Sequence, residues 1–178
     1  LKKSACHPLV VTGMGQNHNF DRSFTASPIT GNFTGKFAGL GHTVGNLTGT
    51  GAIGLFSNSS GLIRDVGVNM STGSAATGTG GLVNTNSGVI KNSFANVSIY
   101  SASIGTLGGL VGTNTGLITN SFSTGSVSGT NMVGGLIGNN GTSSSSSPSN
   151  ILNSFSKASV TGTSGANVGG LIGQNAAS

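Results

Sequence analysis

One unit, repeated with variations, accounts for most of this sequence. The segment from Gly108 to Met132 reads GGLVGTNTGLITNSFSTGSVSGTNM, and related segments begin at Gly54, Gly81, Gly134 and Gly169. The first leucines of the copies are Leu55, Leu82, Leu110, Leu136 and Leu171, so successive copies are 27, 28, 26 and 35 residues apart. A period of this length is typical of a solenoid, whose units bury their apolar surface only by stacking on one another.

The spacing of apolar and turn-forming residues inside each unit predicts short strands. In the copy that begins at Gly108, the apolar stretches are Leu110-Val111, Leu117-Ile118 with Phe122, and Val127, separated by Gly, Asn, Thr or Ser. Short runs with such boundaries are typical of strands. Helix is disfavoured because 33 of the 178 residues are glycine, and each glycine inside a helix costs roughly 1 kcal/mol relative to alanine. We therefore predict an all-β parallel β-helix (β-solenoid) with three short strands per coil of about 27 residues.

Equivalent residues of successive coils should form columns, because parallel strands stack about 4.8 Å apart. The recurring tripeptide NSF predicts an asparagine ladder beside an inward stack of phenylalanines. A second asparagine recurs four residues after the first leucine, next to a turn glycine, where stacked amides can donate and accept along the column. The predicted ladders are Asn92, Asn120 and Asn153; Phe94, Phe122 and Phe155; and Asn86, Asn114, Asn140 and Asn175. An architectural role is favoured over ligand binding, because a binding site seldom needs the same residue on every coil.

The two ends of the sequence differ from the repeats. Residues 1–30 fit the pattern poorly, and we expect an irregular N-terminal segment that acts as a cap or an assembly arm. The β-solenoid is predicted over 31–178, with the segment TSSSSSPS at 142–149 as an insertion loop. An atypical terminal segment is expected because the end of a β-helix exposes unpaired backbone.

Catalytic and metal-binding patterns do not emerge from the sequence. Asp21 and Asp65 are the two acidic residues, so a catalytic carboxylate pair exists only if those two meet. His42 has no acidic neighbour in the sequence for a nucleophile triad. Cys6-His7, with a histidine and an aspartate further on, matches no standard zinc spacing. We predict no enzymatic activity, no catalytic residue, no cofactor and no metal.

The charge pattern argues against two classes of partner. The formal net charge is +5, but the lysines and arginines are scattered and form no basic stripe interleaved with aromatic residues, so no nucleic-acid partner is expected. The sequence has no run of 18 or more apolar residues, so no membrane insertion by a helix is expected.

A resemblance to a known family rests on the strings GGLVGTNTGLITNSFSTGSVSG and GGLIGNN. They resemble the GLUG repeat of bacterial secreted and surface proteins, including filamentous-haemagglutinin-like adhesins and some secreted peptidases. The similarity extends over about Phe33 to Ala176. It implies a right-handed parallel β-solenoid on an exported protein, secreted or held at the bacterial cell surface. The zinc motif HExxH of the peptidases is absent here.

Two non-enzymatic functions follow as expectations. The first is a structural or adhesive segment that acts as a stiff stalk or binding surface, with a host or cell-surface receptor, or a glycan, as partner. The alternative is a subunit of a self-assembling extracellular filament. The last residues read GGLIGQNAAS, an unfinished copy, so we expect either further chain or another molecule there. Candidate residues for end-to-end contact are Val168, Leu171 and Ile172.

Overall fold

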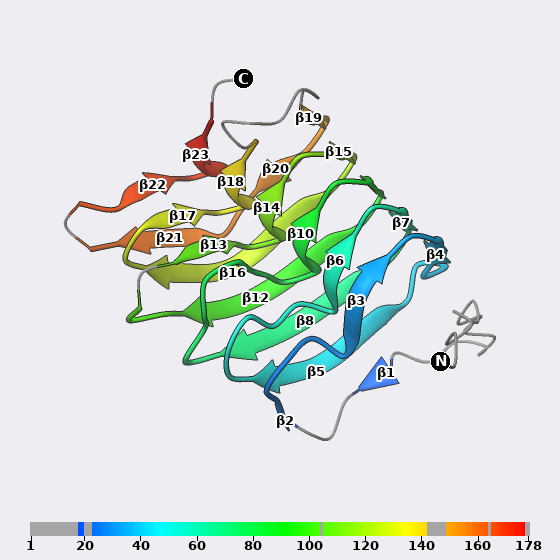
Figure 1. The fold of residues 1–178 in the computed structure, drawn as a ribbon, viewed down its shortest axis with the longest axis horizontal. Coiled ribbons are helices and arrows are strands. Elements are labelled where there is room, and N and C mark those ends of the chain that lie inside the picture. Colours follow the sequence, from blue (N-terminus) through cyan, green and yellow to red (C-terminus); the bar gives the residue numbers. More distant parts are fainter. Residues whose placement is uncertain (1–17, 20–22, 104, 142–148, 164, 177–178) are drawn as a thin grey trace, which may run out of the picture.

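The computed structural model describes residues 18–19, 23–103, 105–141, 149–163 and 165–176. Within these residues the chain is all-β and contains no helix, hence none long and apolar enough to cross a membrane. The strands wind into a β-solenoid whose successive turns lie side by side from the blue to the red end of the chain (Figure 1). Cys6, His7, Asp21 and all but Ser149 of the predicted insertion loop lie outside the described residues.

In the described residues the strands form four sheets. The eight-stranded sheet contains β1 (His18–Asn19), β2 (Ser23–Phe24), β5 (Thr43–Gly49), β8 (Gly67–Thr72), β12 (Phe94–Tyr100), β16 (Phe122–Gly129), β20 (Phe155–Ser156) and β21 (Ser159–Gly162). The six-stranded sheet contains β3 (Ile29–Phe33), β6 (Phe56–Ser59), β10 (Val83–Asn86), β14 (Val111–Asn114), β18 (Ile137–Asn140) and β23 (Ile172–Asn175). The five-stranded sheet contains β4 (Lys36–Ala38), β7 (Leu62–Arg64), β11 (Val89–Lys91), β15 (Leu117–Thr119) and β19 (Asn150–Leu152). The four-stranded sheet contains β9 (Thr79–Gly80), β13 (Thr106–Gly108), β17 (Met132–Gly134) and β22 (Asn167–Gly169).

The predicted fold class is confirmed, and so is the register of its repeats. The strand pairings within these sheets are parallel, and they join equivalent residues of successive copies. In the six-stranded sheet the pairing runs through Phe56, Val83, Val111, Ile137 and Ile172, which are 27, 28, 26 and 35 residues apart. The additional residues of the last copy therefore lie outside the paired strands.

A fourth strand joins the three that the sequence predicts for each coil. In the turn that begins at Thr106, the short strand β13 precedes β14, β15 and β16. Its central residue, Leu107, is fully buried and pairs with Val133 of the next turn. A single apolar residue before a Gly-Gly pair is the signal for this strand, and it is too short to identify from one sequence.

Buried aliphatic columns form the core of the solenoid. Leu82, Leu110 and Leu136, the first leucines of three successive copies, are fully buried. A column of isoleucines in the five-stranded sheet is equally buried: Ile63, Ile90 and Ile118. Removing each such side chain from water stabilises the fold by about 1.5–3 kcal/mol. Each side chain packs against its equivalents above and below, so neighbouring turns stabilise one another.

The phenylalanine column differs from the prediction in its direction. The rings of Phe94, Phe122 and Phe155 do stack, with centroids 5.2 and 5.1 Å apart and planes within 7°. However, Phe94 and Phe122 are only half-buried and Phe155 is exposed. Side chains alternate between the two faces of a strand, and the buried neighbours Ser93 and Ala95 occupy the inward positions. The prediction of an inward stack was wrong because the serine of the NSF tripeptide points inward instead.

The solenoid pairing also begins earlier than the predicted boundary at residue 31. Strands β1 and β2 pair with β5, and β3 starts at Ile29 and pairs with β6. The described parts of 18–30 therefore already contribute strands to the sheets, although their sequence does not resemble the repeat.

Candidate functional site

The inner asparagine column is satisfied from within the chain. Asn86 donates its side-chain amide to Asn114 Oδ1 across 2.8 Å, Asn114 donates to Asn140 across 3.0 Å, and Asn140 donates to Asn175 across 2.8 Å. Asn86 and Asn114 are fully buried. Buried amides need such partners because an unpaired polar group is costly away from water. The column is thus architectural, and its amide groups are already engaged.

The outer asparagine column shapes a corner of each turn. Asn92, Asn120 and Asn153 have positive φ angles of 49°, 49° and 48°, which asparagine tolerates better than most residues. Their side chains are exposed, and Asn120 Nδ2 donates to Asn92 Oδ1 across 3.3 Å. Asp65 occupies the same corner one turn earlier, with φ of 55°, and accepts a 2.9 Å hydrogen bond from Asn92.

Asp65 carries the one carboxylate of an aspartate or glutamate among the described residues. The hydrogen bond from Asn92 is the main cause that holds its pKa below the ordinary value. The Arg64 guanidinium adds a hydrogen bond, an ion pair and its charge, and Lys91 contributes its charge, while burial opposes the shift. Arg64 and Lys91 are paired in register on β7 and β11, so two cations are stacked beside this carboxylate.

The described residues contain no group of three or more His, Cys, Asp or Glu side chains that could hold a metal ion. His42, which the sequence leaves without an acidic neighbour, lies half-buried in the turn between β4 and β5. The carboxylate of Asp65 is engaged by Arg64 and Asn92.

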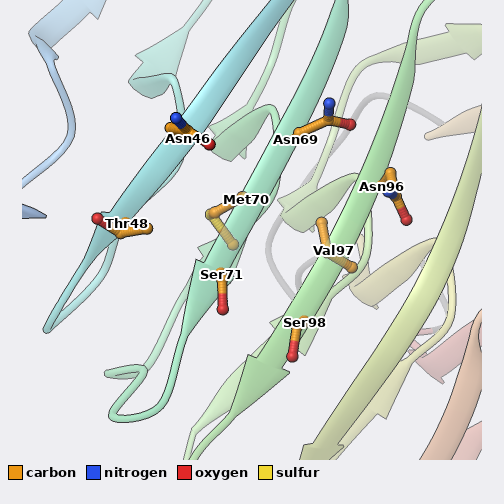
Figure 2. A pocket seen from close by; sticks show the side chains of 8 residues that line it. All are labelled: Asn46, Thr48, Asn69, Met70, Ser71, Asn96, Val97 and Ser98. Atoms are coloured by element: carbon orange, nitrogen blue, oxygen red, sulfur yellow. The ribbon is translucent and has the colours of Figure 1, made fainter. Parts of the chain in front are cut away.

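The most distinctive surface feature is a polar face on the outside of the eight-stranded sheet (Figure 2). We define the amide row as Asn46, Asn69 and Asn96, and the hydroxyl row as Thr48, Ser71 and Ser98. Within each strand the two rows are two residues apart, so both point to the same side. Neighbouring members are paired across the strands: Thr48 with Ser71, Ser71 with Ser98, and Asn69 with Asn96.

A β-bulge shapes this polar face. The register between β5 and β8 shifts between Val44 and Leu47, so that Gly45 and Asn46 lie opposite the single residue Asn69. Asn46 has a positive φ of 54°. Bulges of this kind bend a strand and redirect a side chain. Beside the bulge lies a depression of about 240 Å³, lined by the two rows together with Met70 and Val97.

The three residues predicted for end-to-end contact lie on the last described turn. Val168 in β22 and Leu171 before β23 are 46% and 36% exposed, whereas Ile172 is half-buried and pairs with Ile137. Leu171 continues the column of Leu82, Leu110 and Leu136, which are fully buried. The difference in exposure reflects the position of Leu171 in the last described turn.

The sequence analysis did not predict that the residues of the amide and hydroxyl rows lie together on one outward face. A signal for it is present, because Asn69-Met-Ser and Asn96-Val-Ser repeat the pattern N-x-S at a spacing of 27 residues. The strand assignment needed to place these residues on one outward face comes from β8 and β12 of the structure. Asn46-Leu-Thr has the related pattern N-x-T, but Asn46 lies 23 residues before Asn69 and so breaks the period.

Comparison with known proteins identifies one family model, the GLUG motif, which matches residues 104–128. Neither a curated protein nor a solved structure matches the chain. The matched segment coincides with one turn of the solenoid, from β13 through most of β16. The neighbouring turns pair with this one residue by residue. The chain therefore carries a GLUG motif, and here the motif forms one four-stranded turn of a parallel β-solenoid.

Proposed function

We propose that the chain is a non-enzymatic structural and adhesive segment of a secreted or cell-surface bacterial protein. The solenoid acts as a stiff stalk and carries a surface for a receptor or a glycan. The observation that carries this proposal is the stacking of whole turns in register, in which apolar columns and the inner asparagine ladder join each turn to the next. Such a fold is quasi-one-dimensional, so extra turns lengthen it without changing its cross-section.

Force spectroscopy tests the stalk role directly. The chain is held at its two ends and stretched. Because each turn contacts only its neighbours, we expect stepwise unfolding, with most steps releasing one turn of 26 to 28 residues, or roughly 90 Å of chain. Extension at low force without steps would contradict the proposal.

The adhesive role has a separate readout. Beads coated with the folded chain are applied to cell layers under flow, and the bound beads are counted. Beads coated with the same chain after thermal unfolding are the control. We expect retention to depend on the folded state, and equal retention of the two preparations would contradict an adhesive surface on the solenoid.

Assembly into a filament is a second candidate function, favoured by the exposed apolar side chains of the last described turn. Val168 and Leu171 are exposed there although their equivalents Val133 and Leu136 are fully buried, and either a further turn of the same chain or a second copy would cover them. Sedimentation velocity over a range of concentrations tests for association. Leu171→Asp should suppress association if copies dock through this face, whereas Tyr100→Asp, at an exposed residue of the side wall, should not.

A further inference from the structure

The polar face carries hydrogen-bonding groups that the fold itself does not use. Within the described part of the chain, the side chains of Asn46, Asn69, Ser71 and Ser98 make no hydrogen bond to another residue. Asn96 accepts one hydrogen bond, from Thr124 in the next strand. The inner ladder is different, because its amides satisfy one another. Thr48 Oγ1 shares a 3.3 Å hydrogen bond with Ser23 Oγ. The remaining donors and acceptors of the polar face are available to a ligand.

The strands that line the depression are also free of charge. Strands β5, β8, β12 and β16 contain no Asp, Glu, Lys or Arg. The cations Lys36, Arg64 and Lys91 lie instead on strands β4, β7 and β11 of the five-stranded sheet. Lys157 is an exposed cation on the same sheet, but it follows β20, where its backbone N–H donates to Ser123 and its ammonium lies over the Phe155 ring. An anionic ligand would therefore find no partner charge at the depression itself. The electrostatics thus favour a neutral ligand.

The chemistry of the two rows suits a ligand rich in hydroxyl groups. Each amide offers two donors and an acceptor, and each hydroxyl both donates and accepts, as the hydroxyl groups of a sugar do. The depression of about 240 Å³ beside the bulge is lined by all six residues of the two rows. Its size is on the scale of a single sugar ring, and its polar lining comes from three adjacent strands (Figure 2).

The rows extend beyond the depression. Ser98 of the hydroxyl row pairs with Ser126 in β16, and Ser126 pairs with Ser159 in β21. The spacing of these hydroxyl groups along the solenoid is that of parallel strands, about 4.8 Å. An extended polymer running along the solenoid axis would meet a similar group at each turn. Repeated weak contacts of this kind add up through multivalency.

We infer that the polar face binds an extended neutral polysaccharide, with one sugar ring seated in the depression between Asn46, Asn69 and Asn96. This inference rests on the proposed function, which assigns a binding surface to the solenoid, and it gives that surface a ligand class. The polymer lies across β5, β8 and β12 and continues over the hydroxyl groups of β16 and β21.

Affinity electrophoresis of the full chain tests the inference. Native gels contain a neutral polysaccharide (hydroxyethylcellulose, galactomannan, dextran or a soluble β-1,3-glucan), and one gel contains the anionic polygalacturonate. We expect retardation in at least one neutral gel. The double variant Asn69→Ala/Asn96→Ala should raise the Kd for that polymer about tenfold, because it removes several neutral hydrogen bonds.

Two further variants separate binding from folding. Thr85→Ala/Thr113→Ala is the matched control, because these threonines are paired in register on the six-stranded sheet, away from the polar face. This control should keep the wild-type Kd. Ser71→Lys places a long cationic side chain beside the depression and should abolish retardation while the circular dichroism spectrum stays that of a β-protein.

Three results would overturn the inference. The first is unchanged mobility in all four neutral gels, and the second is equal retardation of the wild type and the Asn69→Ala/Asn96→Ala variant. The third is retardation by polygalacturonate alone that is lost in Lys91→Ala, which would place the binding on the five-stranded sheet. The force measurement is independent of all three. If the chain unfolds turn by turn but binds no neutral polysaccharide, the proposed stalk function stands and the proposed ligand is wrong.

Discussion

The side-chain amide of Asn86 donates a 2.8 Å hydrogen bond to the side-chain oxygen of Asn114, its register partner in the next turn. Both side chains are fully buried. The polar groups of one turn therefore depend on the next turn for their hydrogen bonds. A shift of the register by one residue would leave these amides unpaired away from water, so the column selects the observed stacking.

Asn114→Ala removes the middle of this column. It leaves the Asn86 amide without its acceptor and Asn140 Oδ1 without its donor. A buried unsatisfied group costs about 1–3 kcal/mol, so we expect the free energy of unfolding in urea to fall by about 3 kcal/mol. Asn96→Ala, at an exposed strand position, is the control and should cost less than about 0.5 kcal/mol. Similar losses in the two variants would show that the inner column does not stabilise the stack.

Ser59→Asn should extend the column by one turn. Ser59 pairs with Asn86, is buried, and has a hydroxyl oxygen without a hydrogen-bond partner among the described residues. An asparagine there can donate to Asn86 Oδ1 in the direction of the existing ladder. We expect a gain of about 1 kcal/mol in chemical unfolding. Ser59→Ala, which only removes the unpaired hydroxyl, is the reference. An asparagine variant less stable than the alanine variant would mean that the site has no room for another amide.

Phe122→Ala should cost less than a core truncation, because the phenylalanine stack lies on the outside. Phe122 is half-buried between Phe94 and Phe155. We expect a loss of about 1–2 kcal/mol, near the value of aromatic pair contacts plus partial burial. Leu110→Ala, at a fully buried position, should cost about 2–5 kcal/mol. Thermal and urea unfolding of the two variants compare them, and a larger loss for Phe122→Ala would refute the outward placement of the stack.

Acid should remove the contribution of Asp65. Its pKa is lowered in the folded chain, chiefly by the hydrogen bond from Asn92 and then by Arg64. A lowered folded-state pKa stabilises the fold above the ordinary aspartate pKa of about 3.9, and this stabilisation is lost as the pH falls through the folded-state value.

Asp65→Asn is the matched variant, because asparagine occupies the same corner in later turns at Asn92 and Asn120. We expect the wild type to be more stable than this variant near pH 6 by less than about 1 kcal/mol, the range of exposed ion pairs. The difference should shrink towards pH 2. A difference independent of pH would show that the Asp65 charge does not contribute to folding.

Much of the fold was predictable from the sequence because the repeat period shows which residues lie next to one another in successive turns. The period of the repeat predicts that Leu82, Leu110 and Leu136 lie in one column, and all three are fully buried. The asparagines four residues after each leucine likewise lie in one hydrogen-bonded column. In both columns the same residue type recurs at the same position of each copy, so alignment of the copies identifies the neighbours.

The side to which a residue points was harder to predict. The recurring NSF tripeptide shows which residues stack on one another. Which of its three side chains points inward depends on where the strand begins after the corner at Asn92 or Asn120. That corner uses a positive φ angle, which the sequence suggests but does not locate to one residue. The bulge at Asn46 could not be predicted either, because it interrupts the repeat period from which strand positions are predicted.

One distance shows whether the turns form an uninterrupted stack in register. One row of register partners crosses all strands of the six-stranded sheet, each residue paired with the next: Asn32, Asn58, Thr85, Thr113, Asn139 and Gln174. Asn32 and Gln174 are therefore five strand steps apart, or about 24 Å.

Spin labels on Asn32→Cys and Gln174→Cys, in a chain in which Cys6 is replaced by serine, allow this distance to be measured by pulsed electron paramagnetic resonance. We expect a narrow distance distribution centred within a label length of about 24 Å. Moving the first label to Asn58→Cys should shorten the mean by about 5 Å, one strand step. A broad distribution, or a mean that does not shorten with that step, would contradict the stack.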